Sequence, residues 1–450
     1  MRIDFFKGAA LVLLSIYSSG LAAQDSEIEL LRSSLAELRS EYDARITDLE
    51  NRLAVAEQNA MQANYAAQQA APVTAVSGTG GGGGSSAFNP AIGLIFQGQA
   101  WNYSQNPDAH LIPGFPLGGE AGPVAEGLGL GETELIMNAN VDDKFSALLT
   151  VALAIEDGES IVEVEEAWVE ATALPAGLGA KFGRFFSGIG YLNGKHSHSW
   201  DFADQPLPYQ AFLANQYIDN GVQVRWLAPT NLYMEFGGEF LQGDRYPSAG
   251  SAHSGAGSYS AFANFGGDVG VNNSWLAGVS YLDATAIGRS SGDEDDPLIF
   301  DGESRLATAQ FVWKWAPNGN WKNRNLIVQA EYLQRRERGE YSSTNMAPAA
   351  YNVDQEGWYL QAVYQPIPRW RVGGRIDALS SDDPGPAFDG TLLATPGNDP
   401  RRFSFMADWS NSEFSRLRLQ FTKDESGFID GNHWGLQYIH SIGAHGAHSF

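Results

Sequence analysis

The chain has 450 residues, no cysteine and a formal net charge of −25. Without cysteine it forms no disulfide and no thiolate metal site. The acidic balance argues against nucleic acid as a partner, because phosphate binding needs lysine and arginine. The acid excess has two interpretations: solubility through charge repulsion, or an acidic pore or loop field that favours cations.

Residues 1–23 have the features of a secretory signal peptide. Arg2 and Lys7 give a basic start, residues 9–17 form an apolar core, and cleavage is expected after Ala22 or Ala23. A short buried helix is the alternative. Beyond this segment no stretch approaches the roughly 20 apolar residues of a membrane helix. The exported chain is therefore either soluble or crosses a membrane as a closed barrel, which satisfies strand backbone groups inside lipid.

Residues 25–58 predict a helix with a coiled-coil seam, which we place in the periplasm. Its apolar residues follow one another at spacings of three and four, with one stutter near Tyr42. This narrow stripe favours self-association, as in a trimer, over a lone amphipathic helix. Residues 59–87 are rich in alanine, glutamine and glycine and predict a flexible linker. The apolar residues of the seam are Ile28, Leu31, Leu35, Leu38, Tyr42, Ile46, Leu49, Leu53 and Ala56.

From residue 88 onward the hydrophobic period changes to two. Leu417, Leu419 and Phe421, for example, alternate with Arg418 and Gln420. A transmembrane barrel has this pattern, because apolar residues face lipid and polar residues face the lumen. We predict an all-β transmembrane barrel of about 16 antiparallel strands over residues 88–450, preceded by the α-helical coiled coil. A large soluble β-sandwich or β-helix is the alternative.

Short and long connections alternate along this region, as short periplasmic turns and long outer loops do in outer-membrane barrels. This arrangement predicts the outer membrane of a Gram-negative cell, with membrane lipid as the barrel's surroundings. The short turns are 142–143, 174–178, 228–230 and 366–368, and the long loops are 104–126, 186–219, 242–257, 283–304, 334–355 and 380–400.

The last segment places Trp434, Leu436, Tyr438, Ile442 and Phe450 on one parity. A terminal strand that ends in phenylalanine resembles the signal that the barrel-assembly machinery of the outer membrane reads. The resemblance implies that machinery as a partner through Phe450.

A stretch in the middle of the barrel region resembles the phosphate-selective porin family of the O/P type. It is Val162–Arg184, VEVEEAWVEATALPAGLGAKFGR, followed by FFSGIGYLNGKHSHSWDF. In that family an EAW-E strand, a tight turn and a G-K/R-F strand lead into a long inward loop. The resemblance implies a homotrimer of sixteen-stranded barrels, and some members carry an N-terminal coiled coil before a glycine-rich linker.

Phosphate selectivity in that family rests on lysine and arginine ladders, from which this chain departs. It has 28 basic residues against 53 acidic ones. We therefore transfer the architecture and not the phosphate preference.

The segment Phe185–Leu213 is the main candidate site. In the resembled family this position folds into the barrel and narrows it, and side chains at a narrowing set channel selectivity. An ordinary outer loop is the alternative. The residues predicted to form the constriction are His196, His198, Trp200, Asp201 and Asp204.

His196 and His198 are also a hypothetical metal site. Their spacing of two places both on one strand face, and imidazole with carboxylate is a zinc-type ligand set. Surface or pore-lining histidines without metal are the alternative.

Strand parity places charges of both signs towards the lumen, where mixed walls set a transverse field across an aqueous pore. Arg371, Arg375, Arg416 and Arg418 form a short basic row on neighbouring strands. The full set of predicted pore-lining residues is Glu132, Glu134, Arg225, Glu235, Glu239, Glu331, Arg371, Arg375, Asp377, Arg416 and Arg418.

The sequence contains no G-x-S-x-G elbow, no H-E-x-x-H and no phosphate-binding loop. We therefore predict a passive porin for small hydrophilic solutes or ions, leaning to cations, that is not an enzyme and needs no cofactor. The alternatives are a zinc-binding or metal-uptake barrel, a phosphate- or anion-selective porin, and a barrel enzyme or soluble exported β protein.

Overall fold

The computed structural model describes residues 90–118, 121–156, 159–248, 255–292, 296–395, 397 and 399–443. The predicted signal peptide, coiled-coil helix and linker lie outside the described residues, as does Phe450, and these assignments stay predictions.

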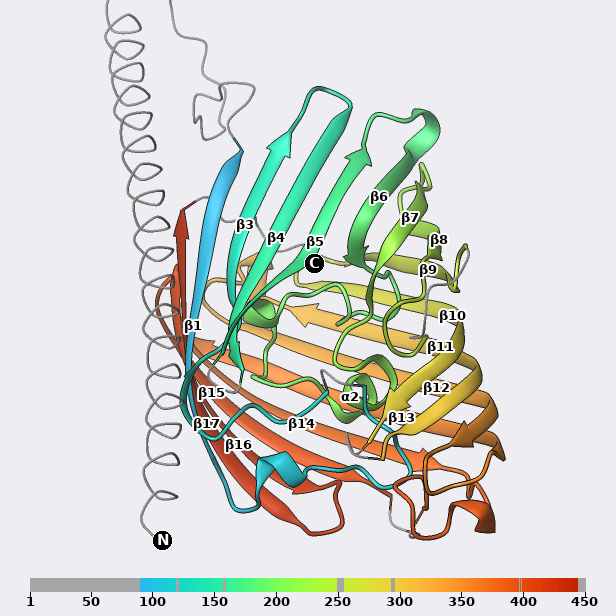
Figure 1. Ribbon diagram of the computed structural model, residues 1–450. Coiled ribbons are helices and arrows are strands. Elements are labelled where there is room, and N and C mark those ends of the chain that lie inside the picture. The colour runs from blue at the N-terminus through green and yellow to red at the C-terminus, as the bar shows by residue number, and fades with distance from the viewer. Residues whose placement is uncertain are drawn as a thin grey trace, which may run out of the picture. The chain divides into compact units, whose positions relative to one another are not determined.

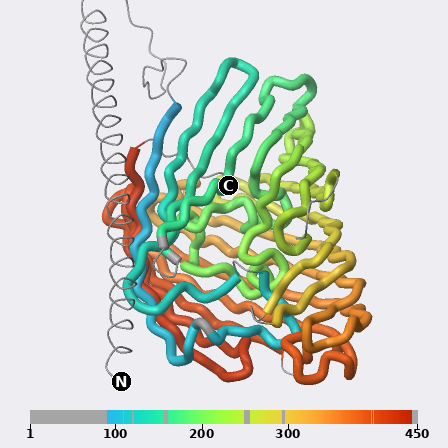
Figure 2. Tube along the Cα trace, in the orientation of Figure 1, coloured from blue at the N-terminus to red at the C-terminus, as the bar shows by residue number. Residues whose placement is uncertain are grey.

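The described chain forms one antiparallel sheet that closes on itself (Figure 1). Figure 2 follows it from β1, in blue, to β17, in red, which lie side by side. Their pairing runs from Gly93 opposite Gly443 to Tyr103 opposite His433 and removes the free edges of the sheet. The strands are β1 (Ala91–Tyr103), β2 (Gly127–Leu130), β3 (Thr133–Asn140), β4 (Phe145–Glu156), β5 (Glu159–Ala171), β6 (Leu178–Phe186), β7 (Ile218–Leu227), β8 (Tyr233–Leu241), β9 (Ser258–Val269), β10 (Asn273–Ser291), β11 (Leu298–Trp315), β12 (Asn325–Ser342), β13 (Ala349–Ile367), β14 (Trp370–Ser381), β15 (Arg401–Ser412), β16 (Ser415–Glu425) and β17 (Gly431–Gly443).

The strand count follows from the way β2 and β3 pair. Both lie against β1, with Leu130 opposite Gly98 and Glu134 opposite Ile95, so they are two halves of one strand interrupted by an extra residue. The described sheet is therefore a sixteen-stranded barrel, and the predicted barrel and its strand number are confirmed.

Helical structure among the described residues is short. It consists of α2 (Leu207–Leu213) and the 3-10 turns η1 (Pro107–Ala109), η2 (Pro175–Gly177), η3 (Ser197–Ser199), η4 (Pro317–Gly319) and η5 (Pro386–Phe388). No helix in these described parts of the chain is long and apolar enough to cross a membrane.

An apolar band surrounds the outside of the barrel. On β13, Trp358 and Leu360 point outward and are exposed, whereas Tyr359 between them is buried inside. The outward side chains of β17 predicted to share a parity are likewise exposed, which confirms that parity: Trp434, Leu436, Tyr438 and Ile442. Lipid is the environment in which such a band is stable, because the paired backbone behind it has no unmet hydrogen bond.

The predicted long loops 283–304 and 334–355 are wrong, because strands β10 to β13 occupy most of both ranges. Beyond the apolar band the outer face of these strands becomes polar, with Arg305 3.1 Å from Asp283 and Arg336 3.3 Å from Asp354 across neighbouring strands. Charged residues suggested loops in the sequence. These charged residues are stable on a strand because this part of the barrel wall lies beyond the lipid and is in contact with water.

The position of the apolar band predicts the effect of a charge on β13. Leu360→Lys places an ammonium group in lipid and should lower the free energy of unfolding by about 2–4 kcal/mol. Asn352→Lys, on the same face about 26 Å along the strand, is the control and should change it little. Tryptophan fluorescence during guanidinium unfolding from lipid vesicles measures both. If both variants lowered the free energy of unfolding equally, the apolar band would not mark the lipid-facing part of the strand.

Candidate functional site

The connection between β6 and β7, residues 187–217, folds into the barrel and is called the inward segment below. Figure 1 shows it in green, carrying α2 within the ring of strands. Its neck is closed by Ser187 N–H, which donates to Tyr217 O at 3.0 Å. The buried Asn193 amide donates to the same two residues' carbonyls at 2.8 Å each and accepts from Tyr217 N–H. The segment is thus held as a loop before it contacts the wall.

Helix α2 provides the apolar contact between this segment and the wall. All seven of its residues are buried, and it ends at Ala214, which has φ 48°. Pro208 packs closely on β13 at Gly357, where a Cβ atom would lie 2.9 Å from the proline Cγ. The helix belongs to one apolar cluster with Leu282, Leu306 and Leu333 of β10, β11 and β12.

Carboxylates of the wall accept backbone N–H groups of the inward segment. Glu331 of β12 accepts from Tyr191 N–H at 2.8 Å and Leu192 N–H at 3.2 Å, and also from the hydroxyl of Tyr209. In the same way Glu239 of β8 accepts from Gly188 N–H at 2.8 Å, and Asp377 of β14 accepts from Leu207 N–H at 3.0 Å. Buried N–H groups that lack strand partners are satisfied in this way.

Arginines of the wall donate to carbonyl groups of the same segment. Arg418 donates to Trp200 O at 2.6 Å, Arg375 to Asp204 O at 2.7 Å and Arg335 to Ala211 O at 3.1 Å. Arg416 donates to His198 O. The wall therefore binds both polar groups of the peptide backbone: its carboxylates accept hydrogen bonds from N–H groups, and its arginines donate hydrogen bonds to C=O groups.

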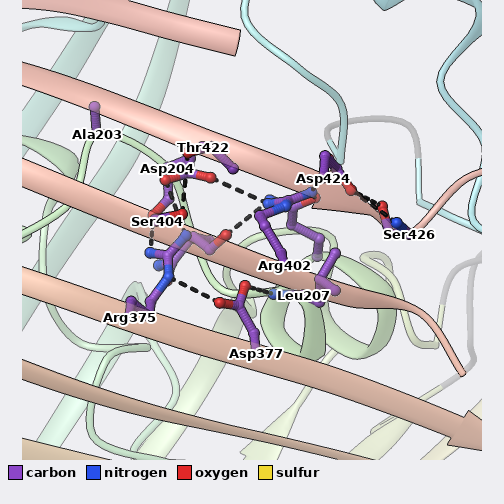
Figure 3. Close-up of polar contacts among 12 residues, drawn as sticks. Ala203, Asp204, Leu207, Arg375, Asp377, Arg402, Ser404, Thr422, Asp424 and Ser426 are labelled. Carbon is purple, nitrogen blue, oxygen red and sulfur yellow. Dashed lines mark hydrogen bonds and ion pairs between the residues drawn. The ribbon is translucent and has the colours of Figure 1, made fainter. Parts of the chain in front are cut away.

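Asp204 connects the segment to two arginines of the wall (Figure 3). Arg375 lies 2.9 Å and Arg402 3.1 Å from its carboxylate, and Arg402 continues to Asp424 at 3.2 Å. Gln420 donates to it at 2.7 Å. Burial raises the pKa of Asp204, but the charges of Arg375 and Arg402 outweigh burial and lower it to about 2.

Asp201, three residues before Asp204, makes a similar connection to the wall. Its carboxylate lies 2.7 Å from Arg371, which also contacts Asp408, and Asp408 lies 3.0 Å from Arg418. The basic side of the wall thus holds five arginines (Arg371, Arg375, Arg402, Arg416 and Arg418) beside five aspartates (Asp201, Asp204, Asp377, Asp408 and Asp424). Their formal charges cancel.

His196 and His198 meet the acidic side of the wall. His198 Nδ1 lies 2.6 Å from Glu134 of β3, and His196 contacts Glu165 and Glu166 of β5 as well as Glu134. Burial lowers the pKa of His196, but hydrogen bonds to the two β5 glutamates and the charge of Glu134 outweigh it and raise the pKa well above its usual value. Both histidines face carboxylates instead of open solvent.

The remaining predicted residues all lie on the inner side of the wall or in the segment. The segment covers Glu134, Glu239, Glu331, Asp377, Arg375 and Arg418, which are buried. Arg225 pairs with Glu170 and Glu235 on the wall, Glu132 contacts Glu165 and Ser197, and Trp200 donates to Lys195 O.

Sequence reasoning missed eight charged residues that the structure places at this site: Glu165, Glu166, Glu170, Lys181, Arg335, Arg402, Asp408 and Asp424. Asp408 alternates with apolar residues on its strand, so parity could have found it. Glu165 and Glu166 are neighbours, and simple alternation would send one of the two outward.

Two cavities are lined in part by residues of the inward segment. The loop-end cavity, of about 430 Å³, is lined by Tyr103, Trp200, Asp204, Arg402 and His433 among others. The turn-end cavity, of about 600 Å³, is lined by Lys181, Tyr191, Lys195, Arg225 and Glu235 among others. Different residues of the segment line the two.

A closed antiparallel sheet of sixteen strands with an outward apolar band and a polar interior defines a porin-like outer-membrane β-barrel. No family model matches the chain. A protein of Aquifex aeolicus (strain VF5), described as uncharacterized, is 32% identical over 342 residues, which cover 72% of this chain and 70% of the Aquifex protein. The chain belongs to the same family as that protein.

Solved outer-membrane proteins are similar to this chain at low identity. The channel DcaP of Acinetobacter baumannii has 14% identity and a TM-score of 0.49, covering 78% of this chain and 97% of DcaP. OmpT of Vibrio cholerae has 11% sequence identity and a TM-score of 0.48, covering 80% of this chain and 99% of OmpT. The anion-selective porin of Comamonas acidovorans has 9% sequence identity and a TM-score of 0.48, covering 78% of this chain and 99% of that porin. These likenesses do not extend to function, and the resemblance to the O/P family stays a prediction.

The contacts of Asp204 predict that neutralising it loosens the inward segment. Asp204→Asn leaves Arg375 and Arg402 without their shared carboxylate, and removal of one partner of a buried pair costs about 3–5 kcal/mol. Limited trypsin digestion, with mass spectrometry of cleavage after Lys195, reports release of the segment. Cleavage should accelerate in this variant.

The exposed Asp389→Asn is the matched control and should leave cleavage unchanged. Because the pKa of Asp204 is depressed, its contribution is present above about pH 4 and is lost as the pH falls towards about 2. Unaltered protection of Lys195 in Asp204→Asn would show that the apolar contacts of α2 suffice.

Proposed function

We propose that the protein is a passive outer-membrane channel for small hydrophilic solutes or ions, with the inward segment as its constriction. One observation carries the proposal: a hydrogen-bonded segment lies inside a sixteen-stranded barrel, and different residues of this segment line two separate cavities. Barrels of sixteen to eighteen strands are wide enough for an aqueous channel. His196, His198, Trp200, Asp201 and Asp204 belong to this segment, as the constriction proposal requires.

Charge in the lumen supports a preference for cations. On the side of β14 to β16 the arginines are balanced by aspartates. On the side of β3 to β8, four bases face six inward glutamates. The bases are Lys181, Arg225, His196 and His198, and the glutamates are Glu134, Glu165, Glu166, Glu170, Glu235 and Glu239. A permeating cation therefore meets a net negative wall on one side and a neutral one on the other.

The anion-selective alternative would need arginines whose charge reaches the permeating ion. The basic row of β14 to β16 is present, but its charge is taken up by aspartates and by carbonyl groups of the inward segment. This pairing is why we favour cations over phosphate.

Removal of the constriction should widen the channel. In planar bilayers the full chain should give stepwise, ohmic conductance, and a variant in which a short Gly-Ser linker replaces residues 189–214 should conduct at least about twice as much, because water then fills the middle of the barrel. Replacing residues 344–347, in the turn between β12 and β13, is the control and should leave conductance unchanged. No conductance from correctly folded full chain would refute the channel proposal.

Cation preference should weaken when a glutamate of the turn-end cavity is neutralised. In a KCl gradient the full chain should show a cation-signed reversal potential, and Glu235→Gln should lower the cation-to-anion permeability ratio by about twofold, since one charge beside a hydrated ion contributes less than about 1 kcal/mol. Glu413→Gln, the same charge change in an exposed turn, is the control. Anion preference of the unaltered chain would contradict the proposal.

We further propose a homotrimer, supported by the coiled-coil pattern of residues 25–58 and by the family resemblance. Cross-linking of the full chain and of a variant without residues 25–58 tests it, and monomers in both would refute it.

A further inference from the structure

A β-bulge turns two neighbouring glutamates of β5 into the barrel. Thr150 of β4 pairs with Glu166 and Val151 pairs with Val164, so Glu165 is the extra residue. Regular alternation would point one of the two glutamates outward. Instead both are buried, at 9% and 7% exposure. Bulges are frequent where a side chain is re-aimed towards a functional site.

The imidazole of His196 lies between these glutamates and β3. Its Nε2 lies 2.9 Å from Glu166, while its Nδ1 lies 3.3 Å from Glu165 Oε2 and 3.4 Å from Glu134 Oε2. In the neutral ring, Nε2–H donates to Glu166, and the lone pair of Nδ1 then faces the two other carboxylates. A histidine whose second nitrogen donates to a carboxylate is the usual arrangement of a histidine metal ligand.

The spacing of the three atoms that face one another suits a metal ion. In a tetrahedral zinc site with bonds of about 2.0–2.1 Å, neighbouring ligand atoms are about 3.3–3.4 Å apart. The two Nδ1 to oxygen distances are 3.3 and 3.4 Å, whereas a charge-assisted hydrogen bond is about 2.7–2.9 Å. All three ligand atoms lie within 4.8 Å of one another.

Negative charge converges on the same point. Glu132 contacts both Glu165 and Ser197, which brings a fourth wall carboxylate to the group, after Glu134, Glu165 and Glu166. The other oxygen of Glu134 is held by His198 at 2.6 Å, which fixes the carboxylate with Oε2 towards His196. Buried carboxylates this close repel each other unless a cation or a proton lies between them.

We propose that a divalent metal ion of the zinc class binds between His196 Nδ1, Glu134 and Glu165. Glu166 and His198 are positioning residues, because they orient His196 and Glu134. The ion joins the inward segment to β3 and β5, on the side of the barrel where the inward glutamates outnumber the bases. The site is independent of the proposed channel function, because the ion would fix the inward segment to the wall and is not the solute that permeates the channel.

Metal binding to the full chain in detergent tests the site. After chelator treatment and removal of the chelator, zinc titration in competition with a chromophoric chelator should show one ion per chain. Glu165→Gln should weaken zinc affinity more than tenfold, and Glu166→Gln about 10- to 100-fold through loss of orientation. His433→Gln removes another histidine of the lumen, a half-buried one that lines the loop-end cavity, and as the control it should bind zinc as the unaltered chain does.

Cobalt gives a readout that needs no variant. Co²⁺ added to the unaltered chain should produce the intense visible absorption of a tetrahedral site, and zinc should displace it. No stoichiometric zinc binding by the unaltered chain, or zinc affinity that Glu165→Gln leaves unchanged, would overturn the proposal. This test does not measure conductance, so failure of the metal proposal would leave the channel proposal standing.

Discussion

The structure depends on one constraint: a peptide segment buried inside a barrel must have its backbone hydrogen bonds made by groups other than strand neighbours. The wall supplies them from charged side chains, with glutamate and aspartate accepting N–H groups and arginine donating to carbonyls. Charge-assisted hydrogen bonds are about twice as strong as neutral ones. The inner-wall charges thus hold the segment as well as setting the field of the lumen.

This constraint also organises the electrostatics. Arginines of β14 to β16 are balanced by aspartates, partly supplied by the segment itself at Asp201 and Asp204. The glutamates of β3 to β8 meet fewer bases, and His196 and His198 lie against them. The two sides of the lumen therefore differ in net charge, although each is densely hydrogen-bonded, and the inward segment carries groups that match each side.

The sequence alone determined the barrel, its approximate number of strands and the positions of most connections. These features depend on local pattern, because a period of two and the turns between runs are read within a few residues. The outward direction of Leu360 or Trp434 could be assigned in this way. Side chains of a strand alternate between two faces, so once the apolar set is assigned to the lipid face, the direction of every residue of a regular strand follows. The resemblance around Val162–Arg184 placed the inward segment correctly between two strands.

Only the tertiary structure decided which charges meet. Asp204 and Arg402 are 198 residues apart in the chain, and their contact follows from the closure of the sheet and the path of the segment through it. The inward turn of both Glu165 and Glu166 needs a bulge, which one extra residue in pairing creates and alternation cannot reveal. Hydropathy predicts loops for the strand ends above the lipid, because their outer face meets water and therefore carries polar residues. Local periodicity determines the direction of a side chain wherever the strand is regular, whereas bulges and the partner of each side chain depend on contacts distant in sequence.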